Sequence, residues 1–394
     1  MDFDDSPEEA AFRADAREWL AANAVPKGSP DDFATGHFAG DMSPAEYVKK
    51  CRWWQGQLFE GGWAGISWPA NAGGRGGKPI QEAIFAEEHS KWGVSNGIFT
   101  VAFGMVAPTL MQHATAAQQE RYLPSMLRGE QLWCQLFSEP DAGSDLASLT
   151  TRAVRDGDEF VVNGQKVWTS NAQHSECGIL IARTNPDAPR HAGITYFVVD
   201  MTTPGIDIRP LRQMNGEAHF NEVFLNDVRV PAANVIGEIN DGWKVAVTTL
   251  SNERVSIAGG SGISDPELLL RLARTIGCTG DPIFRQRFVH AWSRGEAIRF
   301  LRLRSRTALS QGRRPGPEAS VMKLAYARYV KELTNLAVEI QGPYGLLDHP
   351  DARLDGVFQQ KWINAVQSSI GGGTDEIQRN IVGERVLGLP REPK

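Results

Sequence analysis

A carboxylate interrupts an apolar stripe in the segment "GWKVAVTTLSNERVSIAGG". Helical spacings of four, three and seven residues place four apolar residues on one face: Trp243, Val247, Leu250 and Ile257. Glu253 lies between the last two of them. Burial disfavours an ionised carboxyl group, so we expect a raised pKa at Glu253, as suits a general base working near neutral pH. On the pattern alone, a glutamate paired with an arginine in a packed interface is the commoner arrangement, and this alternative stays open.

Three consecutive glycines, Gly371, Gly372 and Gly373, stand before a predicted helix in "SSIGGGTDEIQRNIVGERVLGLP". Glycines lose more backbone entropy on folding than other residues, so a run of them indicates that something approaches the backbone closely. Other chemical motifs are incomplete. The segment "NAGGRGGKP" lacks the first glycine and the hydroxyl residue of a phosphate loop, no "GxGxxG" follows a predicted strand, and the histidines lack metal-ligand spacing.

Predicted helices surround a β-rich middle. Capping patterns begin helices at Ser6 and Ser43, and another helix is predicted from Pro79 to Trp92. Between Trp133 and Ile236 the strand-like runs are "GILIAR", "ITYFVVDM", "GIDIRPL" and "NEVFLNDVRV", and "EFVVNGQKVW" predicts a hairpin with its turn at Asn163 and Gly164. Helical patterns return at Gly242, with further helix starts at Pro282 and Glu318.

This order predicts an α+β multidomain fold with an antiparallel β-module between two helical parts. We expect a helical domain over residues 1–130, a β-domain over 131–238 and a second helical domain over 239–394. The net charge of −6 argues against binding to nucleic acid or a membrane surface. An acidic N-terminus, four scattered cysteines and the lack of an apolar run of about 20 residues predict a cytoplasmic protein.

Four segments, in order along nearly the whole chain, resemble the acyl-CoA dehydrogenase family. They are "FSEPDAGSD", "NGQKVWTSNA", "GWKVAVTTLSNER" and "GGGTDEIQRNIVGERVLGLP". The resemblance implies an N-terminal all-α domain, a central antiparallel β-barrel domain and a C-terminal four-helix bundle. It also implies FAD as cofactor, an acyl-CoA thioester as substrate, and an electron-transferring flavoprotein as the acceptor of electrons.

The same resemblance assigns roles to individual residues. Expected contacts to FAD are Ser138, Trp168 (over the flavin ring), Ser170, Thr374 and Glu376, which is more often Gln in the family. Ser144 is similar to the residue that contacts CoA, and Arg254 is expected at the substrate as the second member of the "ER" pair.

The position of the base separates two branches of the family. Well-known members carry Glu directly before "GT", where this chain has Gly372, whereas isovaleryl- and long-chain-type members place Glu on the helix in an "ER" pair, as at Glu253. The resemblance therefore implies that Glu253 removes the α-proton. It also implies that the N–H of Gly372 polarises the thioester carbonyl, and that a trans-2-enoyl-CoA is formed.

Two segments depart from the family pattern. The family motif "RxxFG" is missing, and the residues that match this region best are Arg274 and Gln286. The motif "QxxGGxG" is altered: Glu339 replaces its Gln, Gly342 is kept, and Pro343 replaces a glycine. In the family these segments contact FAD across a subunit interface. We therefore leave open a homo-oligomer, dimer or tetramer, and a heteromer with a related chain.

Arginines are frequent in "RQRFVHAWSRGEAIRFLRLRSR". A solvated or interface-facing helix is the expected arrangement, and binding of FAD or CoA phosphates is an alternative. A third alternative is nucleic acid, as in a non-catalytic or DNA-associated flavin-binding relative, although the negative net charge and the intact "ER" pair disfavour it. The length and branching of the acyl group do not follow from the sequence, and sterol side-chain thioesters are conceivable.

Overall fold

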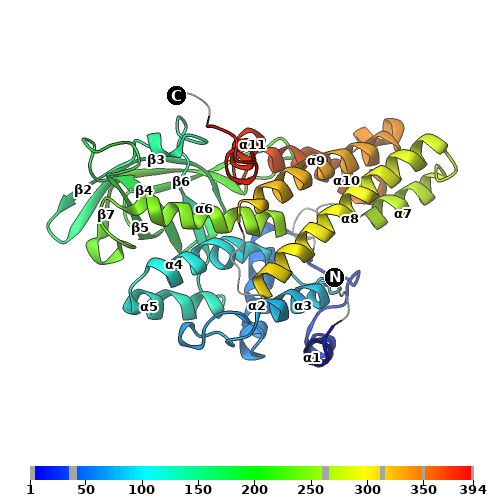
Figure 1. Cartoon of the computed structure of the whole chain (residues 1–394), viewed down its shortest axis with the longest axis horizontal. Coiled ribbons are helices and arrows are strands. Elements are labelled where there is room, and N and C mark those ends of the chain that lie inside the picture. The colour runs from blue at the N-terminus through cyan, green and yellow to red at the C-terminus, as the bar shows by residue number, and fades with distance from the viewer. Residues whose placement is uncertain (1–4, 35–41, 260–265, 311–315, 348–350, 392–394) are drawn as a thin grey trace. The chain divides into compact units, whose positions relative to one another are not determined.

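The computed structural model describes residues 5–34, 42–259, 266–310, 316–347 and 351–391 (Figure 1). The chain forms two compact units that alternate along the sequence. The first unit comprises residues 1–47, 77–95 and 254–394, and the second comprises residues 48–76 and 96–253.

Two helices from the N-terminal part of the chain pack together in the first unit. They are α1 (Pro7–Asn23) and α3 (Pro79–His89). The predicted cap of α1 is confirmed, because Ser6 Oγ accepts from the N–H of Glu9 and the Glu9 carboxylate accepts from the N–H of Ser6. Glu88 of α3 is 2% exposed and binds Arg13 at 3.0 Å and Arg17 at 2.9 Å, which fixes the two helices against each other.

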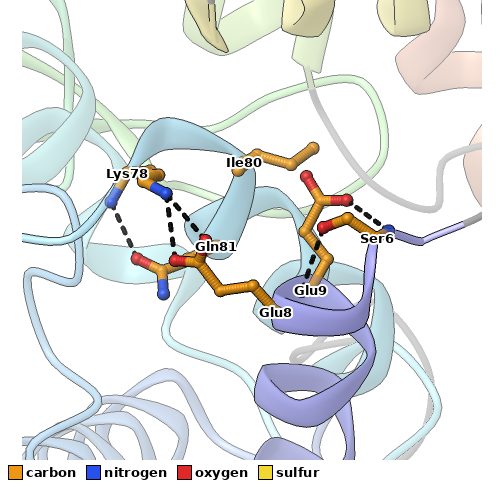
Figure 2. A pocket seen from close by; sticks show the side chains of 6 residues that line it. All are labelled: Ser6, Glu8, Glu9, Lys78, Ile80 and Gln81. Carbon is orange, nitrogen blue, oxygen red and sulfur yellow. Dashed lines mark hydrogen bonds and ion pairs between the residues drawn. The ribbon is translucent and has the colours of Figure 1, made fainter.

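A surface pocket lies where α1 and α3 begin (Figure 2). It is lined by Ser6, Glu8, Glu9, Lys78, Ile80 and Gln81. The polar groups drawn there serve the helix starts: Gln81 Oε1 accepts from the N–H of Lys78, and the Lys78 ammonium binds the Glu8 carboxylate at 2.9 Å. None of the candidate site residues lines this pocket, and its groups already satisfy one another, so we assign it a structural role.

The C-terminal helices form the rest of the first unit. They are α7 (Pro266–Ile276), α8 (Pro282–Ser310), α9 (Glu318–Glu339), α10 (Val357–Ala365) and α11 (Asp375–Ile381). Helix α9 packs against α7, α8, α10 and α11. The shared apolar core includes Leu269, Phe284, Tyr329, Leu333 and Phe358. The predicted helix starts at Pro282 and Glu318 are confirmed.

A seven-stranded sheet forms the core of the second unit (Figure 1). The strands are β1 (Trp133–Leu136), β2 (Arg152–Asp156), β3 (Glu159–Ser170), β4 (Cys177–Arg183), β5 (Ile194–Asp200), β6 (Ile206–Leu211) and β7 (Phe220–Pro231). Their order is β1-β4-β2-β3-β7-β6, with β5 paired to β4. The predicted strands are confirmed, but the sheet is not wholly antiparallel, because β1 runs parallel to β4.

The predicted hairpin turn at Asn163 and Gly164 is wrong. Strand β3 continues through both residues, and Asp156 pairs with Glu159, so the turn lies at Gly157, where φ is +65°. A Cβ atom at Gly164 would lie 2.3 Å from Thr151 Oγ1. The glycine therefore allows a close strand contact at an irregularity of the ladder, where the register with β7 shifts, and does not make a turn.

Helices of the second unit include α2 (Pro44–Glu60), which begins in the first unit, α4 (Ala107–His113) and α5 (Ala116–Leu127). Helix α6 (Gly242–Gly259) begins beside β5, and its residues up to 253 belong to the second unit (Figure 1). Buried hydroxyls join these elements, since Thr249 Oγ1 lies 3.1 Å from the Tyr196 hydroxyl and 3.0 Å from Thr109 Oγ1. Among the helices of the described residues, none is long and apolar enough to cross a membrane.

Candidate active site

The buried face of α6 differs from the predicted stripe. Val245, Ala246 and Thr249 are buried, whereas Val247 is 41% exposed, and the side chain of Ile257 lies outside the described residues. Glu253 is half-buried and follows Thr249 by one helical turn. Glu253 therefore adjoins the packed face of the helix, but on a line of residues that the sequence pattern did not single out.

The carboxylate of Glu253 has a polar neighbour on the sheet. Gln135 Nε2 of β1 donates to Glu253 Oε2 at 3.4 Å, and Gln135 is itself half-buried. An amide N–H that donates to a carboxylate stabilises its ionised form and restricts its orientation. Sequence reasoning missed Gln135, because nothing in a single sequence indicates that β1 and α6 meet.

Trp168 has an unusual backbone conformation. Its φ is +61°, in the left-handed region that residues other than glycine rarely adopt, and its side chain is 61% exposed. It lies where the register between β3 and β7 shifts, and the preceding residue, Val167, donates its N–H to the carbonyl of Ser138 at 2.9 Å. Strained backbone at an exposed aromatic residue is a feature of ligand sites.

A buried ion pair joins the two segments that carry Ser138 and Trp168. Lys166 Nζ, fully buried, donates to Glu139 Oε1 at 2.9 Å and to the carbonyl of Phe137 at 3.0 Å. Glu139 also accepts from the N–H groups of Thr150 and Thr151. Burial opposes ionisation of Glu139, but Lys166 and these donors outweigh it and lower its pKa to about 2. Burial lowers the pKa of Lys166 to about 8, which leaves it protonated at neutral pH.

The hydroxyls near Trp168 differ in their surroundings. Ser138 and Ser170 are half-buried. Thr169 Oγ1, between Trp168 and Ser170, is buried and has no hydrogen-bond partner within the part of the chain that the structure describes. Ser144 is exposed in the loop that follows Ser138, next to Asp145, which forms an ion pair with Arg190. The second unit therefore brings Ser138, Trp168 and Ser170 into one connected region.

The first unit carries the glycine run as a turn before α11. Gly372 has φ +67° and Gly373 has φ +89°. The group that approaches this backbone is the buried side chain of Gln378, because a Cβ atom at Gly373 would lie 2.6 Å from Gln378 Nε2. Thr374 is the N-cap of α11, and its hydroxyl accepts from the N–H of Ile377. Neither Gln378 nor its contact was evident from the sequence.

The other predicted residues of the first unit are exposed, except for Arg254. Glu376 is exposed and forms an ion pair with Arg379 at 3.1 Å. Arg274 and Gln286 are exposed on α7 and α8, and Gly342 adopts φ +56° after α9. Arg254 is half-buried on α6. Among the described residues, no hydrogen bond links Arg274 or Gln286 to the glycine turn.

Several arginines of α8 are engaged by carboxylates within the first unit. Arg287 forms an ion pair with Glu339, and Arg294 binds Glu332 at 2.7 Å. Arg299 binds Glu296 at 2.8 Å. These pairs agree with a solvated or interface-facing helix. Within the described residues, no cluster of three or more His, Cys, Asp or Glu side chains could hold a metal ion.

Comparison with known proteins covers almost the whole chain. Three family models match: the acyl-CoA dehydrogenase N-terminal domain at residues 6–130, the middle domain at 134–228 and the C-terminal domain at 240–387. The chain is similar to "Acyl-CoA dehydrogenase IpdE1" of Mycolicibacterium smegmatis, with 38% identity over 97% of this chain and 98% of the relative. The protein of that name from Mycobacterium tuberculosis is 40% identical over the same shares.

Solved structures give a similar result. The "Tcur3481-Tcur3483 steroid ACAD" has a TM-score of 0.84 at 31% identity and covers 100% of both chains. The "ChsE4-ChsE5 complex from Mycobacterium tuberculosis" has a TM-score of 0.80 at 29% identity, again with 100% of both chains covered. Each of these two names denotes a pair of chains.

Proposed function

Because the chain belongs to the acyl-CoA dehydrogenase family, we propose that it is an FAD-dependent enzyme that converts an acyl-CoA thioester to its trans-2-enoyl-CoA. The observation that carries this proposal is the position of Glu253, half-buried on α6 and hydrogen-bonded to Gln135, in a chain with glycine at the alternative base position. We also assign the sheet to the family's β-barrel domain and helices α7 to α10 to its four-helix bundle.

The residues of the second unit fit a flavin. Members of this family are flavoproteins. Trp168 offers an exposed aromatic face, Ser138 and Ser170 offer hydroxyls, and Thr169 Oγ1 is a buried polar atom without a partner among the described residues. In the first unit, Thr374, Glu376, Arg274, Gln286 and Gly342 remain proposed contacts to FAD by resemblance. FAD, when bound, supplies the acceptor for the hydride that leaves the β-carbon.

Glu253 is the proposed base. Its carboxylate takes the proton from the α-carbon, and the amide of Gln135 holds that carboxylate in one orientation. The N–H of Gly372 donates to the thioester carbonyl, where negative charge develops as the proton leaves. Ser144 and Arg254 bind other parts of the substrate.

We infer a bulky acyl group, because a solved relative that covers this whole chain is named a steroid enzyme. We also infer assembly with a second, related chain, because two solved relatives are named as pairs of chains. An electron-transferring flavoprotein is the proposed acceptor of the electrons.

A dye-free absorbance assay tests this function. Purified protein is mixed anaerobically with short straight-chain, branched and steroid-derived acyl-CoA thioesters, and the loss of flavin absorbance is followed. We expect the bulky thioesters to bleach the flavin fastest. Glu253→Gln should keep the flavin and slow bleaching by about 10²- to 10⁴-fold, as for loss of a general base. Glu238→Gln, an exposed glutamate of the same unit, is the control. Bleaching of Glu253→Gln at the wild-type rate would contradict the assignment.

A further inference from the structure

The glycine turn contains two successive left-handed residues. Gly372 and Gly373 both have positive φ values, and glycine has the widest choice of backbone conformations of any residue. A turn that must present a donor at a fixed position therefore needs contacts that select one of these conformations. Side chains around the turn supply such contacts.

Two fully buried side chains bind the carbonyl groups of this turn. Gln378 Nε2 of α11 donates to the carbonyl of Gly372 at 2.8 Å and lies 3.4 Å from that of Gly373. Lys323 Nζ of α9 donates to the carbonyl of Gly373 at 2.7 Å. Both residues are 0% exposed, and Lys323 also binds Asp375 Oδ1 at 3.3 Å.

Hydrogen bonds to the carbonyl groups also orient the peptide groups of the turn. In a trans peptide the C=O and the N–H of the next residue point in opposite directions. When Gln378 and Lys323 hold the carbonyls of Gly372 and Gly373, the N–H groups of Gly373 and Thr374 must point away from them. These two bonds fix the φ and ψ angles of Gly373, which lies between the two held peptide groups. Because the peptide group that follows the Cα of Gly372 is held, the Gly372 N–H can change direction only through rotation about φ and ψ of Gly372 itself.

We propose that Gln378 and Lys323 are positioning residues that hold the glycine turn in the conformation in which the Gly372 N–H polarises the substrate carbonyl, an inference that rests on the proposed function. A donor that is already oriented costs no reorganisation when charge develops. Neither side chain touches the substrate in this proposal. Both act through the backbone of the turn.

The chain offers a matched control on the same helix. Lys331 of α9 donates to Ser369 Oγ at 2.6 Å and lies 3.9 Å from Asp375 Oδ2, but within the described residues it binds none of the glycine carbonyls. Lys331→Met therefore disturbs the same polar network without releasing the turn. Gln378→Met and Lys323→Met remove a donor to the turn while keeping side chains of similar length.

The decisive measurement is exchange of the substrate's α-protons with D₂O. A 3-thia-acyl-CoA has sulfur at the β-position and no hydride to give there, so exchange reports proton removal alone. At a saturating concentration we expect Gln378→Met and Lys323→Met to slow exchange by about tenfold or more, with unchanged flavin content and little change in affinity for the analogue. Lys331→Met should stay within about twofold of wild type, as is usual for a substitution away from the site.

The outcomes separate this inference from the proposed function. If wild-type protein catalyses no exchange, or if Glu253→Gln exchanges as fast as wild type, the proposed function fails. If wild type exchanges and folded Gln378→Met exchanges at the same rate, the function stands and the positioning role is wrong. Should a methionine variant not fold, Gln378→Asn decides, because its shorter amide no longer reaches the Gly372 carbonyl.

Discussion

At the scale of single residues, the amide of Gln135 contributes to holding the proposed base. Glu253 sits on a helix whose neighbouring buried positions are apolar or carry hydroxyls, and Gln135 approaches it from β1. A hydrogen bond from an amide to a carboxylate restricts the orientations that the carboxylate adopts. Gln135 is therefore expected to matter for the chemical step and not for binding of the thioester.

Replacement of Gln135 by leucine tests this expectation. Gln135→Leu should lower kcat by about tenfold, the value of one hydrogen bond to a charged group, and leave KM for the acyl-CoA near the wild-type value. Gln165→Leu is the matched control, because Gln165 Nε2 also donates to a glutamate, Glu222, on the same sheet at 3.0 Å. Steady-state kinetics give both constants. A rise in KM alone would show that Gln135 serves substrate binding instead.

At the scale of elements, the Glu139–Lys166 pair connects the loop after β1 to strand β3. Its carboxylate and ammonium are both buried, and removal of one partner leaves an uncompensated charge in the interior. The pair also fixes the segment of Ser138 against the segment of Trp168. Loss of the pair is therefore expected to disturb the region assigned to the flavin. Both segments had been singled out in the sequence, but their connection had not.

We expect each single substitution of this pair to destabilise the protein by about 3–5 kcal/mol, and the double substitution by less than the sum. The variants are Lys166→Met, Glu139→Gln and their combination, followed by thermal and denaturant unfolding. Arg229→Met, which breaks exposed pairs with Asp156 and Glu159 on the same sheet, should destabilise the protein far less. Additive losses in the double variant would mean that the two charges do not support each other.

The same pair predicts a pH dependence. The pKa of Glu139 is about 2 in the folded protein, below the value of about 4.3 for an unfolded glutamate. Its contribution to stability is therefore present above pH 4.3 and is lost as the pH falls towards 2. The double variant, which lacks the carboxyl group, should lose less stability over this range than wild type.

Elements were more predictable from the sequence than their connections. The cap at Ser6 and the proline at the start of α8 are local signals that survive folding. The turn at Asn163 and Gly164 was predicted wrongly because the same glycine signal serves a close strand contact, and only Thr151 across the sheet decides between them. Local patterns cannot report a contact between distant segments.

At the scale of the whole molecule, the order of its parts could be predicted, because hydrophobic period and family motifs both extend over the full chain. Individual contacts could not be predicted, because each depends on which helix or strand packs beside it; examples are those of Gln135, Lys323 and Gln378. The oligomeric assembly is even less predictable from the sequence than these contacts. The resemblance assigns the segment around Glu339 to FAD contacts between subunits, yet Glu339 departs from the family's usual Gln.

Glu339 gives a testable reason to expect a partner of different sequence. A hydrogen bond from Arg287 holds the pKa of Glu339 below its usual range, so it is anionic at neutral pH. We expect an anion at this proposed FAD contact to weaken the binding of FAD, which is itself negatively charged. We expect the chain purified alone to contain less than one flavin per chain. Glu339→Gln should raise this ratio of flavin to chain, as measured by native mass spectrometry and flavin absorbance. Glu332→Gln, which removes another arginine-bound carboxylate of α9, is the control. A homo-oligomer that is fully loaded with flavin, and indifferent to Glu339→Gln, would instead show that this chain completes its own sites.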